Sequence, residues 1–263
     1  MLALVSGFIA GVSLGLTGGG GSILGVPLLV YVVGLSPHLA VGTSLVAVGV
    51  TALLSSLKYM RAGHVRVGVG LLMAVTGFAG VYLGSYANRM VSGPVLLLVF
   101  AAFMLVVGAG MVRDALNPRA NREPSGEAAE PSNPGGRGAG RYARALLAGF
   151  GVGLLSGFLG VGGGFIIVPT LLWVLGLAMR DAVGTSLFII FLNGIAGVVS
   201  YTLQGRPLDY VVTGFFVAGG ALGGYLGAAA ATRVSERTLK LAFAALVFGV
   251  AAYIIAANLG RVA

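Results

Sequence analysis

Two glycine-rich segments are the residues of this sequence best suited to bind a ligand. The first, at residues 17–22, reads Thr-Gly-Gly-Gly-Gly-Ser, and the second, at residues 160–164, reads Gly-Val-Gly-Gly-Gly. Each lies within a long apolar stretch. Because glycine costs about 1 kcal/mol per residue in a helix, we expect the helix to break at both segments.

A helix that begins after a break directs free N–H groups and the positive end of its dipole toward that break. Backbone groups arranged in this way bind anions. The alternative is that the glycines only let helices cross closely, which the spacing of Gly77, Gly80 and Gly84 and of Gly220, Gly223 and Gly227 also suits. The candidate ligand residues at the two breaks are Thr17, Gly19, Gly20, Gly21, Ser22, Gly162, Gly163 and Gly164.

Polar side chains recur on one long apolar segment of each half of the chain. Ser44 and Thr51 are seven residues apart, and Ser186 and Asn193 repeat that interval, which places each pair on one helix face. A polar stripe on each of two helices suits a small polar ligand, although such hydroxyls also bond to backbone carbonyls of their own or neighbouring helices. The candidates on these segments are Thr43, Ser44, Thr51, Thr185, Ser186 and Asn193.

The two halves of the chain are related by duplication. Pro27 and Pro169 are 142 residues apart, and the same offset pairs Ala-Val-Gly-Thr-Ser-Leu at residues 40–45 with the identical segment at residues 182–187. About half of the positions between residues 15 and 45 are identical to their counterparts, which is a stronger match than chance similarity of apolar segments would give.

The composition indicates an integral membrane protein. Hydrophobic residues make up 57% of the chain, charged residues 9%, and the mean hydropathy is +1.01, whereas about a quarter of the residues of soluble domains are charged. The net charge of +9 comes from Lys and Arg in polar breaks, so membrane topology explains it better than nucleic-acid binding does. The first apolar run lacks the basic start of a signal peptide, so we expect it to belong to the fold.

The residue types of catalytic and metal sites are scarce. The chain has no cysteine, and the two histidines, His38 and His64, stand alone in polar breaks without acidic neighbours in sequence. Neither glycine segment is followed by the Lys-Ser/Thr of a nucleotide-binding loop. We therefore expect no enzyme activity, no cofactor and no metal. Tyr59 and Tyr201 recur through the repeat, and we expect them to anchor at the membrane surface.

Apolar runs divide each half into five pieces, of which the first two are shorter than the roughly 20 residues needed to span a bilayer. We predict an all-α integral membrane fold of two homologous inverted repeats, with glycine-broken segments at the start of each half. These segments either cross the membrane or form re-entrant hairpins. The first repeat is expected at residues 1–112, a flexible linker at residues 113–143 and the second repeat at residues 144–263.

The basic residues indicate the orientation. With an odd number of crossings in each half, thirteen of the sixteen Lys and Arg residues lie on the side of the linker, and only Arg89, Arg206 and Arg261 lie on the other. By the positive-inside rule the linker is cytoplasmic. A parallel repeat with four crossings per half would give a weaker asymmetry.

The paired motifs resemble the sulfite exporter TauE/SafE family. They are Gly-Gly-Gly-Gly-Ser at residues 18–22 with Pro27, Gly-Val-Gly-Gly-Gly at residues 160–164 with Pro169, and Val-Gly-Thr-Ser in each half. The resemblance implies a multi-pass permease of the bacterial inner membrane for sulfur-containing anions such as sulfite, sulfonates or thiosulfate. We therefore expect a secondary transporter of such an anion, embedded in the lipid bilayer. An anion channel, a transporter of another small anion, and a homodimer remain alternatives.

Overall fold

The protein is described here from a computed structural model, which describes residues 1–88, 93–117, 137–159, 164–203 and 209–262. These residues form ten α-helices and one π-helical turn, and they contain no strand. In the first half the elements are α1 (Leu2–Thr17), α2 (Gly20–Pro27), the π-helical turn η1 (Leu28–Val32), α3 (Pro37–Arg61), α4 (Val67–Asn88) and α5 (Gly93–Leu116). In the second half they are α6 (Arg137–Leu159), α7 (Gly164–Trp173), α8 (Met179–Leu203), α9 (Tyr210–Ala231) and α10 (Glu236–Val262).

Five helical segments are long and apolar enough to cross a membrane. They are Gly42–Arg61, Val67–Gly84, Val99–Leu116, Tyr210–Ala231 and Glu236–Ala256. Large apolar side chains on these segments, such as Val75, Val106 and Leu222, are exposed in the isolated chain, as expected for residues that face lipid. The protein is a multi-pass membrane protein.

Helices α5 and α6 extend into the segment expected to be a linker. Helix α5 continues through Arg113 to Leu116, and α6 begins at Arg137. A cation in the last turn of a helix interacts favourably with the helix dipole, which is why the polar residues after Val112 need not end α5. The rest of the expected linker, residues 118–136, lies outside the described residues.

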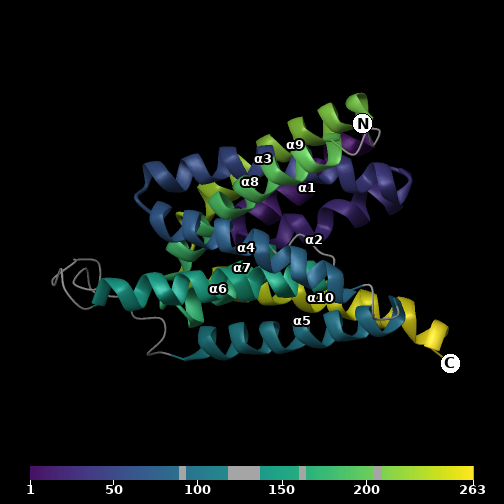
Figure 1. The fold of residues 1–263 in the computed structure, drawn as a ribbon. Helices are drawn as coiled ribbons and strands as arrows, with labels where there is room; N and C mark the ends of the chain where they lie inside the picture. The colour runs from purple at the N-terminus through teal and green to yellow at the C-terminus, as the bar shows by residue number, and fades with distance from the viewer. Residues whose placement is uncertain (89–92, 118–136, 160–163, 204–208, 263) are drawn as a thin grey trace.

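Most helices lie side by side along one common direction, with both chain termini at the same end (Figure 1). The C-terminal end of α5 and the N-terminal end of α6 lie at the opposite end, which we call the linker end (Figure 1). The short helix α7 lies inside the bundle, and its residues from Phe165 to Val168 are almost fully buried. The rings of Phe100 and Phe103 in α5 pack edge-on against Phe165 at centroid distances of 5.3 and 6.1 Å.

Two helix pairs join the halves through glycines. Helix α1 packs along α9, and its residues Gly7, Gly11 and Gly15 face the α9 backbone. Helix α4 packs along α6, and its residues Gly80 and Gly84 face the α6 backbone. A Cβ atom at any of these glycines would lie within 3.0 Å of a backbone atom of the facing helix. The regularly spaced glycines of α4 (Gly77, Gly80 and Gly84) and of α9 (Gly220, Gly223 and Gly227) each face an atom of a neighbouring helix. This confirms the alternative interpretation, that these glycines allow helices to pack closely.

Candidate functional site

The first glycine segment ends α1 and starts α2. Helix α1 ends at Thr17, Gly18 adopts the left-handed conformation with φ of 72°, and Gly19 precedes α2. A residue with a Cβ atom is strained at this φ, so glycine permits the turn. After the turn, α2 packs back against α1, with Gly21 next to Leu14. Helix α1 therefore ends, and α2 begins, within the first glycine segment.

Side chains of the segment hold the turn together. Thr17 donates its hydroxyl proton to the Ser13 carbonyl at 2.7 Å and accepts the Gly20 N–H at 2.9 Å. Ser22 donates to the Gly19 carbonyl at 2.7 Å. Ser13, which the sequence analysis did not select, has a buried Oγ with no hydrogen-bond partner among the described residues, and this atom lies near Gly20. The local bonds leave other N–H groups at the start of α2 unpaired within the helix.

Helix α7 starts against this turn. A Cβ atom at Gly164, the first residue of α7, would meet the Ser22 hydroxyl and would lie 3.0 Å from Ile190 Cδ1 and 3.3 Å from the Gly19 carbonyl oxygen. The starts of α2 and α7 therefore meet in the interior of the protein, although the two residues are far apart in the sequence. Gly162 and Gly163, which were predicted to contribute to this site, lie outside the described residues.

Helix α8 closes one side of the turn. The hydroxyl of Ser186 lies 2.8 Å from the carbonyl oxygens of both Gly18 and Val183, and its single proton is shared between them. Ser44, the counterpart of Ser186 in the first half, lies over α2, where a Cβ atom at Gly25 would be 2.5 Å from its hydroxyl. The structure thus brings together Thr17, Gly19, Gly20, Ser22, Gly164 and Ser186.

A small cavity lies beside the break, between α1, α2, α3 and α9. Its volume is about 10 Å³, and its lining includes Gly21 and Thr51 from the predicted set together with Gly7, Ala10, Gly11, Leu14, Val48, Phe216 and Gly220. Thr51 is 2% exposed, and its hydroxyl has no hydrogen bond to a described residue. A volume of this size holds about one water molecule.

Three other predicted residues lie away from the break. Thr43 forms a 3.1 Å hydrogen bond with Thr213 of α9, and Thr185 accepts the backbone N–H of Arg66 at 3.0 Å. Asn193 is partly exposed on α8. Their role as ligands stays a prediction, but the hydroxyls of Thr43 and Thr185 already have protein partners.

Three polar side chains near the linker end, His64, Arg66 and Asp181, form a cluster that was not predicted from the sequence. Asp181 is 8% exposed; its Oδ2 accepts from Arg66 Nε at 3.0 Å and from an Arg66 terminal nitrogen at 2.8 Å. His64 Nδ1 lies 2.7 Å from Asp181 Oδ1. His64 has no acidic neighbour in the sequence but has one in the fold, because the loop between α3 and α4 packs on α8.

Tyr59 also differs from the expectation of an interfacial anchor. Its side chain is fully buried, and its hydroxyl donates to the Gly15 carbonyl at 3.1 Å. A buried tyrosine retains a partner for its hydroxyl, and the last turn of α1 supplies a free carbonyl. Tyr201 is not described at the level of its side chain.

Within the described part of the chain, no group of three or more His, Cys, Asp or Glu residues could hold a metal ion.

Comparison with known proteins gives the family. The sequence model of the Sulfite exporter TauE/SafE family matches residues 3–254, nearly the whole chain. The chain belongs to this family. Among relatives of this TauE/SafE protein, a probable membrane transporter protein of Xylella fastidiosa is 35% identical, over 97% of this chain and 94% of the relative. The probable membrane transporter protein YunE of Bacillus subtilis is 29% identical, over 92% of each chain.

This TauE/SafE protein is a membrane transporter, since its family is described as an exporter and these relatives as probable membrane transporter proteins. No solved structure matches the chain.

Proposed function

We propose that the protein is a secondary transporter that moves a small sulfur-containing anion, such as sulfite or an organosulfonate, across the bacterial inner membrane. The observation that carries the proposal is the meeting of the starts of α2 and α7 at Gly19 and Gly164. Each helix start carries about half a positive charge and unpaired N–H groups, so two of them together favour an anion. The family description supports a sulfur oxyanion as the cargo.

The chemistry of the surrounding side chains fits this cargo. Thr51 supplies a hydroxyl beside the break, and the residues placed at the break are uncharged. An anion held by dipoles and hydroxyls avoids the large desolvation penalty of a buried ion pair and can leave the site again. We propose that the break binds the anion for part of the transport cycle.

An inverted repeat accounts for the helix pairing. At the offset of 142 residues α1 corresponds to α6 and α4 to α9. The packing of α1 on α9 and of α6 on α4 is then the same contact made twice, with the halves exchanged. We propose that α1 with α2, and α6 with α7, form re-entrant hairpins that enter from opposite sides, with the linker in the cytoplasm. Sites between such repeats are typical of secondary transporters.

The cavity at Gly21 and Thr51 is too small for the proposed cargo. It holds about one water molecule, whereas sulfite has four non-hydrogen atoms. The helices that line it must separate before the anion enters, so the conformation described here represents a closed state in the proposed cycle.

The first test of this proposal is flux into proteoliposomes. We expect saturable flux of sulfite, thiosulfate or an organosulfonate, and a loss of about tenfold or more in Gly164→Ala, because the new Cβ atom would meet the Ser22 hydroxyl. Gly151→Ala is the matched control, since a Cβ atom at Gly151 has no neighbour within 4 Å. Absence of flux of all these anions by the folded protein would reject the proposal. Flux that neither saturates nor shows trans-stimulation would indicate a channel.

A second prediction separates ligand residues from packing residues. Thr51→Val should lower the apparent affinity for the anion by up to about tenfold and change stability by less than about 1 kcal/mol, because the Thr51 hydroxyl has no hydrogen bond to a described residue. Thr43→Val should instead lower stability by about 1 kcal/mol with little effect on affinity, because it leaves the Thr213 hydroxyl without its partner. Concentration-dependent flux and thermal unfolding measure the two quantities. The reverse pattern would remove Thr51 from the site.

A further inference from the structure

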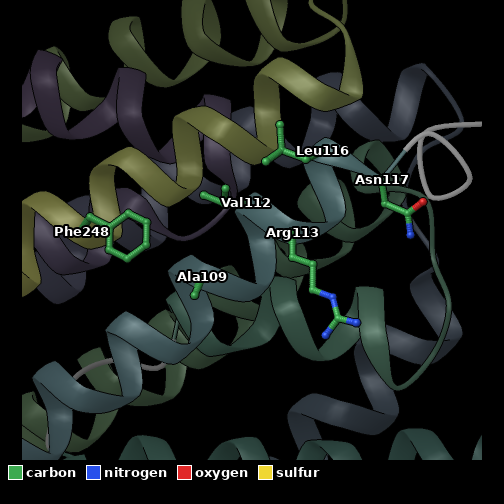
Figure 2. A pocket seen from close by; sticks show the side chains of 6 residues that line it. All are labelled: Ala109, Val112, Arg113, Leu116, Asn117 and Phe248. Atoms are coloured by element: carbon green, nitrogen blue, oxygen red, sulfur yellow. The ribbon is translucent and has the colours of Figure 1, made fainter.

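An open groove lies between α5 and α10 at the linker end. Its volume is about 680 Å³, and it is lined by Ala109, Val112, Arg113, Leu116 and Asn117 of α5 and by Phe248 of α10 (Figure 2). Helices α5 and α10 pack on each other. The groove is separate from the helix break, and the proposed transport function does not involve it.

One end of the groove is apolar and is formed by residues of two candidate membrane spans. Ala109 and Val112 belong to the candidate span Val99–Leu116, and Phe248 belongs to the span Glu236–Ala256. The ring of Phe248 packs on Gly108, where a Cβ atom would lie 3.0 Å from it. From Gly108 to Leu116 a helix rises about 12 Å, which is most of the roughly 15 Å half-thickness of the hydrocarbon core.

The other end of the groove carries the positive charge of Arg113. Arg113 is exposed in the last turn of α5. Its side chain forms no hydrogen bond or ion pair with any residue that the structure describes. The neighbouring carboxylate, Asp114, accepts a hydrogen bond from the indole N–H of Trp173 instead. Arg113 therefore remains available to an anionic group near the C-terminal end of the candidate span.

From this arrangement we propose that the groove binds an anionic phospholipid of the leaflet at the linker end. One acyl chain lies along Ala109, Val112 and Phe248, and the phosphate contacts the Arg113 guanidinium, with Asn117 at the mouth. The charge of Arg113 complements the phosphate, and the apolar length matches a chain within one leaflet. By the positive-inside rule this leaflet is the cytoplasmic one, which is rich in anionic lipid.

The test is native mass spectrometry of the full chain, purified with phosphatidylglycerol and phosphatidylcholine in equal amounts. We expect a bound phosphatidylglycerol whose preference over phosphatidylcholine falls about fivefold in Arg113→Ala and is retained in Arg113→Lys. Arg237→Ala is the matched control, because Arg237 is also exposed near the linker end but does not line the groove. An equal loss of preference in Arg237→Ala would overturn the proposal and indicate a general surface attraction.

A second variant tests the apolar part of the groove. Ala109 is exposed, so Ala109→Trp should fold and fill the groove, and we expect it to remove bound lipid of both kinds. Retention of the lipid in this variant would overturn the proposal. The proposal would also be overturned if Ala109→Trp converted a dimer to a monomer without changing the bound lipid, because the groove would then be a subunit interface.

Discussion

Replacing Gly153 with alanine is expected to destabilise the protein by about 2–3 kcal/mol. A Cβ atom at Gly153 in α6 would lie 2.8 Å from the Cα and carbonyl carbon of Gly77 in α4. Backbone atoms cannot move aside as a flexible side chain can, so the two helices must separate along their length. At about 2–4 °C per kcal/mol, the midpoint of thermal unfolding in detergent should fall by about 5–10 °C.

Gly151→Ala is the matched control for this substitution. Gly151 lies two residues earlier in the same helix, and a Cβ atom there meets nothing within 4 Å. Alanine favours helix over glycine by up to about 1 kcal/mol, so the midpoint should stay unchanged or rise slightly. Equal effects of the two substitutions would show that helix propensity, and not the contact between α4 and α6, determines the stability here.

Removing Arg66 is expected to destabilise the protein by about 3 kcal/mol. The Asp181 carboxylate is largely buried, with its side chain 11% exposed, and Arg66→Ala leaves it with His64 as its remaining side-chain hydrogen-bond partner. Asp181→Ala should cost less, about 2 kcal/mol, because the side chains of Arg66 and His64 are 38% and 32% exposed and can be solvated by water. Thermal unfolding of both variants in detergent measures the difference.

A double-mutant cycle isolates the contribution of this pair. The variant with both substitutions should be more stable than the sum of the two effects predicts, with a coupling of about 1 kcal/mol or more. Arg237→Ala, which changes an exposed arginine, should change stability by less than about 0.5 kcal/mol. Additive effects of Arg66→Ala and Asp181→Ala would argue against a direct energetic role of the contact.

The ion pair connects parts of the chain that the proposed repeats assign to different halves. Arg66 follows α3 of the first half, and Asp181 lies in the first turn of α8 of the second half. At the repeat offset the counterpart of Asp181 is Leu39, which cannot form an ion pair. The contact therefore has no equivalent ion pair at that position of the first half.

The sequence by itself determined that the protein is helical and lies in a membrane. Long apolar runs with few charges are stable only as spanning helices, and a run of glycines ends a helix whatever surrounds it. The break between Thr17 and Gly20 was predicted for this reason, because it depends on the conformational freedom of the residues themselves. The duplication also pointed to corresponding positions in the two halves.

The tertiary structure decided which of the candidate residues meet. Gly19 and Gly164 approach each other because α2 and α7 pack inside the bundle, whereas the hydroxyls of Thr43 and Thr185 are taken up by contacts with other parts of the chain. His64 appeared unpaired because its partner, Asp181, is 117 residues away in the sequence. Periodicity places a side chain on a helix face, but only the packing of helices determines what that face contacts.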